Sequence, residues 1–354
     1  MTFLMFILGL AALVIGAELM VRGASRLATT VGVSPLVVGL TVVAFGTSSP
    51  EVAVSINAAL SGSTDLAVGN VVGSNIFNVL FILGISALIT PLVVHSQIIR
   101  QEVPILIGSC LLMFALSADN RIDLTESVLL LLTLAAYTVF LVVQSRKESQ
   151  EIKDEYATEN VKRTTWDQSV YVQLALVAGG LYLLVQGSEW LVDSAVSFAR
   201  QMGVSDIVIG LTIVAAGTSM PEVATSIMAA IKGERDIAVG NVIGSNTFNI
   251  LGCLGLTGLV APDGIPVPPS VMNFDLWVML AVCFACIPVF MTGREIARWE
   301  GAVFLSYYVA YVAYLILASQ AHDAIDAFSS VMMSFVVPIT VITLVAVMIR
   351  SRPH

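Results

Sequence analysis

Residues 46–51 read Gly-Thr-Ser-Ser-Pro-Glu, and residues 217–222 read Gly-Thr-Ser-Met-Pro-Glu. The two hexapeptides belong to a longer repeat, because residues 34–78 and 205–249 lie 171 positions apart and share 30 of 45 residues. Each copy places a carboxylate, hydroxyls, amides and a helix-breaking Gly/Pro pair inside a long apolar segment. Such groups are expensive at membrane depth and mark an ion or substrate pathway. One interrupted hydrophobic segment in each half of a chain is typical of a secondary transporter.

The composition is that of an integral membrane protein. Of the 354 residues, 57% are hydrophobic and 12% are charged, and the mean hydropathy is +0.92. A water-exposed surface would need far more charge than this. The sequence has no basic patch with interleaved aromatic residues, so we expect no nucleic-acid partner. Membrane lipid is the expected surrounding.

Hydrophobic runs bounded by turn and charge signals predict eleven membrane spans. Five lie at about residues 2–28, 34–61, 65–90, 103–118 and 124–145, and five more at about 169–200, 205–231, 236–260, 274–292 and 297–318. One extra span follows at about 331–349. The predicted fold is an all-α polytopic membrane protein with two inverted five-helix repeats plus one extra C-terminal helix. The predicted domains are the repeats 1–145 and 169–318, a cytoplasmic linker at 146–168, and the extra span with a cytoplasmic tail at 319–354.

Basic residues predict the orientation of these spans. With the N-terminus outside and every span crossing once, the inner loops and tail hold 14 of the 16 Lys and Arg residues. Only Arg121 and Arg200 remain outside, which satisfies the positive-inside rule. Five spans separate equivalent points of the two copies, so the second copy enters the membrane in the opposite direction. We expect a multi-pass protein of the plasma or inner membrane with a cytoplasmic C-terminus.

Each copy should contain a broken helix. Pro50 and Pro221 lie in the middle of predicted spans, where proline removes a backbone donor and clashes with the previous turn. Irregular backbone survives at that depth only where protein or a water-filled cavity satisfies it. We therefore expect freed carbonyls near Ala44 and Ala215 to be available as ligands.

Oxygen-bearing side chains surround each expected break, and their three- and four-residue spacings place them on shared helix faces. They are Thr47, Ser48, Glu51, Ser74 and Asn78 in the first copy, and Thr218, Ser219, Glu222, Ser245 and Asn249 in the second. Oxygen ligands suit hard cations such as Ca²⁺, Na⁺, Mg²⁺ or Mn²⁺ rather than softer metals. Two carboxylates would balance one divalent ion, and the same oxygens could be divided among several monovalent ions. Four further amides, Asn70, Asn75, Asn241 and Asn246, are expected to brace the bent helices by hydrogen bonds.

Two other functional classes remain open at this point. A cation channel could use the same oxygen ligands, although paired broken helices suit an occluded site better than a continuous pore. An intramembrane hydrolase would need a base beside its nucleophile, and the sequence places no His or Lys within the membrane beside Ser48 or Ser219. We therefore expect a transporter, not an enzyme, and no resident cofactor.

The doubled motif, Gly-Thr-Ser-x-Pro-Glu followed by Gly-Asn-x-x-Gly-Ser-x-x-x-Asn, resembles the α-repeats of the sodium/calcium exchanger family in the calcium/cation antiporter superfamily. The resemblance covers the first ten spans and implies an antiporter that exchanges Na⁺ for Ca²⁺ by alternating access. It implies Ca²⁺ ligation by Glu51 and Glu222. It also implies Na⁺ sites shared among Thr47, Ser48, Ser74, Asn78, Thr218, Ser219, Ser245, Asn249 and the carbonyls of Ala44 and Ala215.

Departures from related sequences narrow the expected ions. Proton-coupled relatives carry a Gly-Asn-x-x-Glu type motif where this chain has Gly-Thr-Ser-x-Pro-Glu, which disfavours proton coupling. Potassium-dependent relatives carry Asp where this chain has Asn249, which disfavours K⁺ co-transport. A proton- or potassium-linked divalent cation antiporter is the alternative function.

Overall fold

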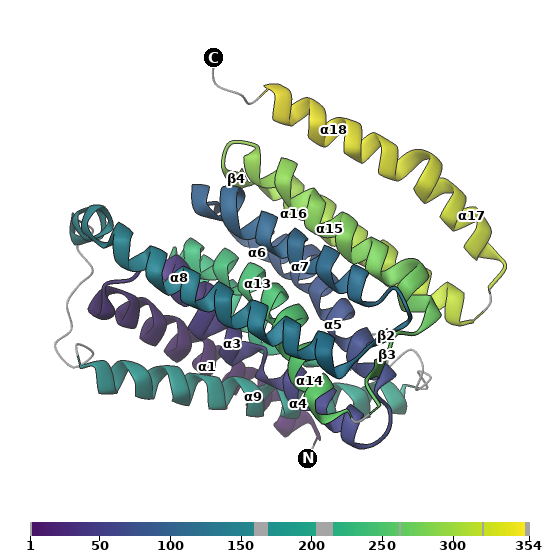
Figure 1. The fold of residues 1–354 in the computed structure, drawn as a ribbon, viewed down its shortest axis with the longest axis horizontal. Coiled ribbons are helices and arrows are strands. Elements are labelled where there is room, and N and C mark those ends of the chain that lie inside the picture. Colours follow the sequence, from purple (N-terminus) through teal and green to yellow (C-terminus); the bar gives the residue numbers. More distant parts are fainter. Residues whose placement is uncertain (1, 159–168, 203–214, 262, 321, 351–354) are drawn as a thin grey trace.

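The structure is a computed structural model that describes residues 2–158, 169–202, 215–261, 263–320 and 322–350. It is a bundle of long helices in which the two halves of the chain interleave (Figure 1). Within the described residues of the first half, the helices are α1 (Thr2–Val31), α2 (Pro35–Val38), the π-helix η1 (Gly39–Val43), α3 (Ala44–Thr47), α4 (Ser49–Leu60), α5 (Asp65–Phe77), η2 (Asn78–Leu83), α6 (Gly84–Ile89), η3 (Ile98–Glu102), α7 (Val103–Leu116) and α8 (Leu124–Thr158).

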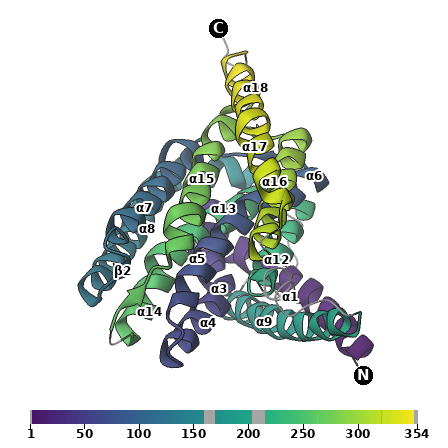
Figure 2. The same ribbon diagram turned by 90° about the vertical axis from the view of Figure 1, so that its right-hand side faces the viewer.

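The second half repeats this order. Its described helices are α9 (Val170–Gln201), α11 (Ala215–Gly217), α12 (Met220–Lys232), α13 (Arg235–Phe248), η6 (Asn249–Cys253), α14 (Leu254–Val260), η7 (Val271–Asp275), α15 (Leu276–Met291) and α16 (Arg298–Ser319). The extra segment comprises α17 (Ala324–Val331), η8 (Met332–Val336) and α18 (Val337–Arg350). It lies along one edge of the bundle beside α15 and α16 (Figures 1 and 2).

Long apolar helices confirm most of the predicted spans. In the described residues, nine helices are long and apolar enough to cross a membrane. A tenth span is the pair Pro35–Thr47 and Ser49–Leu60, which is bent by 41° at the predicted break. The predicted span 205–231 lies partly outside the described residues, which show its second part as α12. The extra span runs over Ala324–Leu344 and thus begins earlier than the predicted residue 331.

Helices α1 and α9 pack along one another at backbone contact. A Cβ atom at Gly16 would lie 2.8 Å from the Gly180 carbonyl oxygen, and one at Gly9 would lie 2.9 Å from the Gly187 carbonyl oxygen. Glycines spaced seven residues apart therefore form one seam between the two first helices of the repeats. Small residues at membrane helix interfaces permit this close approach, where dispersion contacts replace the hydrophobic effect.

Short strands join the two halves at each end of the bundle. β1 (Leu92–Val93) pairs antiparallel with β4 (Glu295–Ile296), and β2 (Arg121–Ile122) pairs with β3 (Ile265–Pro266). Each pair takes one strand from each repeat, and the two pairs lie at opposite ends of the molecule (Figure 1). This arrangement matches the predicted inversion, which put loops 92–93 and 295–296 on one side and loops 121–122 and 265–266 on the other.

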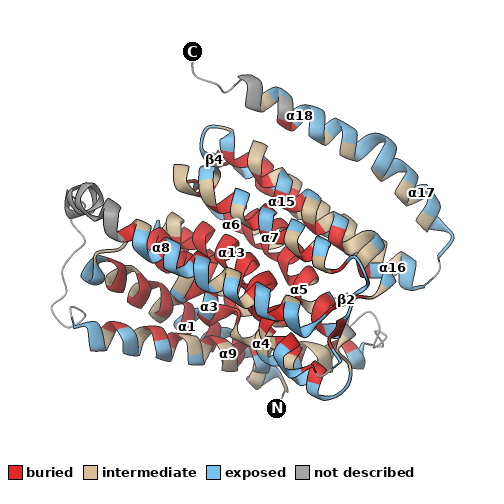
Figure 3. Cartoon of the chain, viewed as in Figure 1, coloured by how far each residue is buried: buried red, intermediate tan, exposed pale blue. Residues whose placement is uncertain are grey.

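The core lies where the repeats meet. Every residue in the most apolar stretch of the span Arg235–Val260 is buried, whereas only 11% of the corresponding stretch of α16 is buried, on the periphery of the bundle (Figure 3). Polar residues of the repeated motif occupy this buried centre, and Glu51, Glu222, Asn78 and Asn249 are all 0% exposed. The fold therefore buries these polar residues of the repeated motif in the centre of the bundle.

The close packing of α1 against α9 can be tested by substituting two adjacent glycines of α9. We expect Gly180→Ala to destabilise the protein by about 1–3 kcal/mol, because an added methyl group overpacks a closed interface. A Cβ there would lie 2.6 Å from the Met20 nitrogen. Gly179→Ala is the matched control, since no atom of the described chain lies within 4 Å of its Cβ position. Replacing this glycine, which lies within a helix, should raise the free energy of unfolding by up to about 1 kcal/mol. The midpoint of thermal unfolding of the detergent-solubilised variants measures both effects. Equal shifts of this midpoint in the two variants would contradict the close backbone packing of α1 against α9.

Candidate cation site

The site is built on the two helix breaks. Pro50 and Pro221 lie in the first turns of α4 and α12, where proline costs no hydrogen bond within its own helix. Each proline leaves the carbonyl four residues earlier without its usual donor. Ser49 Oγ donates to the Gly46 carbonyl at 2.6 Å, and Ser188 Oγ donates to the Gly217 carbonyl at 2.6 Å. Side-chain hydroxyls thus satisfy both of these carbonyls.

The expectation of a freed carbonyl at Ala44 is wrong in this detail. The Ala44 oxygen accepts the Ser48 backbone N–H at 3.0 Å, because the proline acts two residues farther along the chain. The hydroxyls of Thr47 and Ser245 also approach this oxygen, at 3.4 and 3.5 Å. Ala44 therefore lies where both repeats converge. Ala215 is the first described residue after the gap at 203–214 and begins α11, just before the second break.

Each glutamate is held by the break of the opposite repeat. Ser48 Oγ donates to Glu222 Oε1 at 2.9 Å, and Ser219 Oγ donates to Glu51 Oε1 at 2.8 Å. All four side chains are 0% exposed. The exchange of hydrogen bonds brings two residues 171 positions apart into one polar centre. This is the twofold arrangement that the repeat predicted.

Several buried oxygens in this centre have no hydrogen-bond partner within the described part of the chain. They are Glu51 Oε2, Glu222 Oε2, Ser74 Oγ, Asn78 Oδ1, Asn249 Oδ1 and Thr218 Oγ1. All six belong to residues selected from the sequence. A buried polar atom without a partner costs about 1–3 kcal/mol, so six together need a physical explanation. Oxygen atoms of this kind are what Ca²⁺ and Na⁺ accept as ligands.

Asparagines next to the site brace the helices, as predicted. Asn70 Nδ2 donates to the Glu51 carbonyl at 3.2 Å and to Ser55 Oγ at 3.0 Å. The equivalent Asn241 donates to Ser226 Oγ at 3.0 Å. Each amide thereby ties the helix after the break to the next helix of its own repeat. Asn241 also accepts from Thr47 Oγ1 at 3.1 Å, which links the two repeats.

A second set of amides joins α5 to α13 across the centre. Asn75 donates to the Asn246 carbonyl and Asn246 donates to the Asn75 carbonyl, both at 3.2 Å. Asn78 Nδ2 donates to Asn246 Oδ1 at 2.9 Å, and Asn249 Nδ2 donates to Asn75 Oδ1 at 3.4 Å. The donors of Asn78 and Asn249 are therefore engaged while their oxygens stay available. This orientation suits a cation ligand.

Sequence reasoning missed further polar groups. Ser55 and Ser226 lie one turn after the two glutamates and anchor the bracing amides. Ser86 and Thr257 are fully buried, and neither hydroxyl has a partner within the described residues. Both pairs keep the 171-residue offset. Ser55 and Ser226 are identical residues inside the repeat, and Ser86 and Thr257 would have been found by extending the comparison beyond residues 78 and 249.

A third missed pair lies outside the motif. Tyr137 donates to Glu102 at 2.7 Å, and Tyr311 donates to Asp275 at 2.8 Å. Each tyrosine ties the fifth helix of its repeat to a carboxylate at the start of the fourth. Glu102 and Asp275 lie 173 positions apart, and Tyr137 and Tyr311 lie 174 apart. A comparison at the fixed offset of 171 therefore fails to align them.

Matches to known proteins cover both halves of the chain. The sequence matches the family described as "Sodium/calcium exchanger protein" over residues 1–143 and 172–317. It is 34% identical over 283 residues to the inner membrane protein YrbG of Escherichia coli, covering 80% of this chain and 87% of that protein. It is 33% identical over 344 residues to the sodium/calcium exchanger MaX1 of Methanosarcina acetivorans, covering 88% of this chain and 98% of that protein.

A solved structure agrees with the architecture. The sodium-calcium exchanger NCX_Mj, soaked with zero Na⁺ and Ca²⁺, matches with a TM-score of 0.75 and 30% identity. The match covers 89% of this chain and 98% of that one. Since the family match spans both repeats and the fold agrees with a solved exchanger, this chain is an integral multi-pass membrane protein that belongs to the sodium/calcium exchanger family, a family of transporters.

Proposed function

We propose that the protein is a secondary antiporter that exchanges Na⁺ for Ca²⁺ by alternating access. One observation carries the proposal: Glu51 and Glu222 each accept a hydroxyl from the opposite repeat and each keep a second oxygen without a partner. Two buried carboxylates in contact with neutral donors need positive charge, because an uncompensated buried ion is costly. A divalent cation between them supplies both charges at once.

Na⁺ would use the same oxygens in a different grouping. The hydroxyl oxygens of Ser74 and Thr218 and the amide oxygens of Asn78 and Asn249 are buried atoms that have no hydrogen-bond partner within the described residues. They can complete several small oxygen cages that share the two carboxylates, with Thr47, Ser48, Ser219, Ser245 and the carbonyls of Ala44 and Ala215 as the remaining ligands. Because the cages overlap with the Ca²⁺ site, Na⁺ and Ca²⁺ would compete. Competition at shared ligands is the physical basis of exchange.

The inverted repeat supplies two equivalent states. Helices α4 and α12 both start at the central breaks and would run to opposite faces of the membrane. Exchanging the conformations of repeats 1–145 and 169–318 would therefore open the site to the other side. The linker 146–168 and the N-terminus take opposite sides in this scheme, with the N-terminus outside. The tail that follows the extra span is then cytoplasmic, as the distribution of Lys and Arg favours.

The alternatives predict different fluxes. A channel would carry current without a counter-ion, whereas an antiporter would not. A potassium-linked carrier would require K⁺ together with Na⁺, and a proton-linked one would run on a pH gradient alone. The amide of Asn249 argues against the potassium-linked form, because it offers an oxygen without the charge of a carboxylate.

We predict that Glu51→Gln and Glu222→Gln each reduce ⁴⁵Ca²⁺ uptake into Na⁺-loaded proteoliposomes at least 100-fold. Glutamine keeps the shape of the side chain but removes one of the two charges that offset Ca²⁺. A loss of 100-fold corresponds to about 2.7 kcal/mol, just below the roughly 3–5 kcal/mol expected when one partner of a buried charge pair is removed. Elution as a single monodisperse species would establish that each variant is folded.

Glu189→Gln is the matched control for this experiment. Glu189 is exposed on α9 and its side chain accepts a hydrogen bond from Gln186 at 3.1 Å. It should retain uptake near that of the unmodified protein. Near-normal uptake by either Glu51→Gln or Glu222→Gln would reject the central site.

We also predict that exchange moves net charge. If more than two Na⁺ leave for each Ca²⁺ that enters, uptake into Na⁺-loaded vesicles should accelerate when the interior is made positive. Each charge that crosses the membrane contributes about 2.3 kcal/mol per 100 mV. Setting the potential with a K⁺ gradient and valinomycin measures this dependence. Uptake that is indifferent to voltage would support an electroneutral stoichiometry instead.

A further inference from the structure

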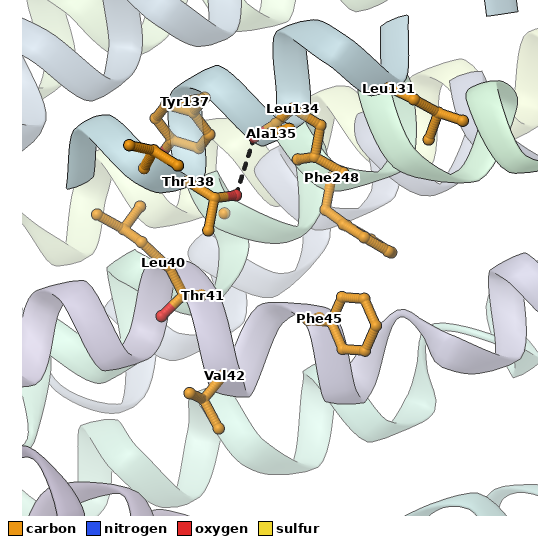
Figure 4. A pocket seen from close by; sticks show the side chains of 12 residues that line it. Leu40, Thr41, Val42, Phe45, Leu131, Leu134, Ala135, Tyr137, Thr138 and Phe248 are labelled. Atoms are coloured by element: carbon orange, nitrogen blue, oxygen red, sulfur yellow. Dashed lines mark hydrogen bonds between the residues drawn. The ribbon is translucent and has the colours of Figure 1, made fainter. Parts of the chain in front are cut away.

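A groove lies on the outside of the bundle between the second and fifth helices of the first repeat. Leu40, Val42 and Phe45 form one wall, and Leu134 and Thr138 of α8 form another (Figure 4). Its volume is about 660 Å³, within the range of sites that take small molecules. Phe248 of α13 lies between the two walls.

The lining offers hydrocarbon but no free polar group. Thr41 Oγ1 donates to the Val37 carbonyl at 2.6 Å, and Thr138 Oγ1 donates to the Leu134 carbonyl at 2.9 Å. The hydroxyl of Tyr137, which also lines the groove, is taken by Glu102. All other lining side chains are apolar. A ligand in this groove gains binding free energy only from shape complementarity and apolar contact.

The groove lies at the depth of the hydrocarbon core. Ala135 is midway along the span Leu124–Ser145, and Phe45 lies close to the middle of the bent span Pro35–Leu60. Phe45 is 60% exposed and Val42 is 38% exposed, so this wall faces outward rather than into the bundle. At mid-membrane depth, the medium that meets such a surface is the acyl chains of lipid.

The groove also lies directly behind the candidate cation site. Phe45 follows Ala44, and Gly244 and Phe248 adjoin Ser245 and Asn249. A Cβ at Gly244 would lie 2.6 Å from the Leu40 carbonyl oxygen, so α13 contacts the backbone of η1 without an intervening layer of side chains. The rings of Phe45 and Phe248 meet edge to face, with centroids 4.9 Å apart. A molecule bound in the groove would therefore contact the same backbone segments that carry the candidate cation ligands.

We propose that an acyl chain of a membrane phospholipid occupies this groove and packs against η1, α3 and α13. The π-helical turn of η1 is a local irregularity next to a helix break, and the acyl chain supports it from the lipid side. The occupant is a lipid tail rather than a polar metabolite, because every polar side chain of the lining is already bonded. It is a tail rather than a headgroup, because the groove lies at mid-span.

Photolabelling in proteoliposomes tests this site. A phosphatidylcholine that carries a diazirine at the middle of one acyl chain is incorporated, activated, and mapped by peptide mass spectrometry. We expect labelling at residues 42–45 to exceed, several-fold, the labelling at Leu132, which is 63% exposed on α8 but does not line the groove. Ala135→Trp, which fills the groove, should lower labelling at residues 42–45 at least threefold.

Leu132→Trp is the matched control, since it adds the same side chain to α8 outside the groove and should leave labelling at residues 42–45 unchanged. Val42→Trp blocks the groove from the opposite wall and should lower labelling of α8 at Ala135, so the test survives if one variant fails to fold. Labelling that follows exposure alone, or that is unaffected by both filling variants, would overturn the proposal. The absence of lipid adducts at residues 42–45 would likewise overturn it.

Discussion

The structure depends on two carboxylates that are placed together in a medium that does not tolerate them. Glu51 and Glu222 are fully buried, and each is bonded by a serine of the other repeat. Those hydrogen bonds orient the carboxylates without neutralising them. Two such charges at membrane depth are costly, and bound cations would offset that cost in the proposed exchange. The stability of the centre and the proposed ion binding would then depend on the same two carboxylates.

The surrounding fold buries this centre and leaves several of its oxygens without a hydrogen-bond partner within the described residues. Prolines place the breaks where each glutamate begins a new helix, and serine hydroxyls satisfy the carbonyls that those prolines leave. Asn78 and Asn249 use their N–H groups for bracing, and their side-chain oxygens have no partner within the described residues. Glycines allow helices to touch at backbone distance, both between α1 and α9 and where Gly244 meets η1. Proline, serine, asparagine and glycine thus each have a distinct structural role around the centre.

Much of this could be predicted from the sequence because the chain is repeated. The offset of 171 residues predicted the inverted architecture and the ten side chains of the candidate cation site, because two similar segments are expected to occupy equivalent places in the two repeats. The break at Pro50 followed from the chemistry of proline and is observed as a 41° bend. Two other features are not predicted by the repeat. The Ala44 carbonyl keeps its backbone amide partner. The Tyr137–Glu102 pair lies where the offset between the repeats is no longer 171 residues. No local pattern encodes either feature, nor the strands that join the two repeats.

In the proposed exchange, the coupling of ions would follow from the same carboxylates. A site filled by Ca²⁺ or by several Na⁺ would be compensated in a low-dielectric interior, whereas an unfilled site would carry two bare charges through it. The carrier should therefore change sides only when loaded. The most direct measurement is ⁴⁵Ca²⁺ uptake into proteoliposomes whose interior holds either Na⁺ or an impermeant organic cation at equal ionic strength. The account predicts rapid uptake with internal Na⁺ and none above the protein-free background without it. Robust uptake with no exchangeable cation inside would contradict the account.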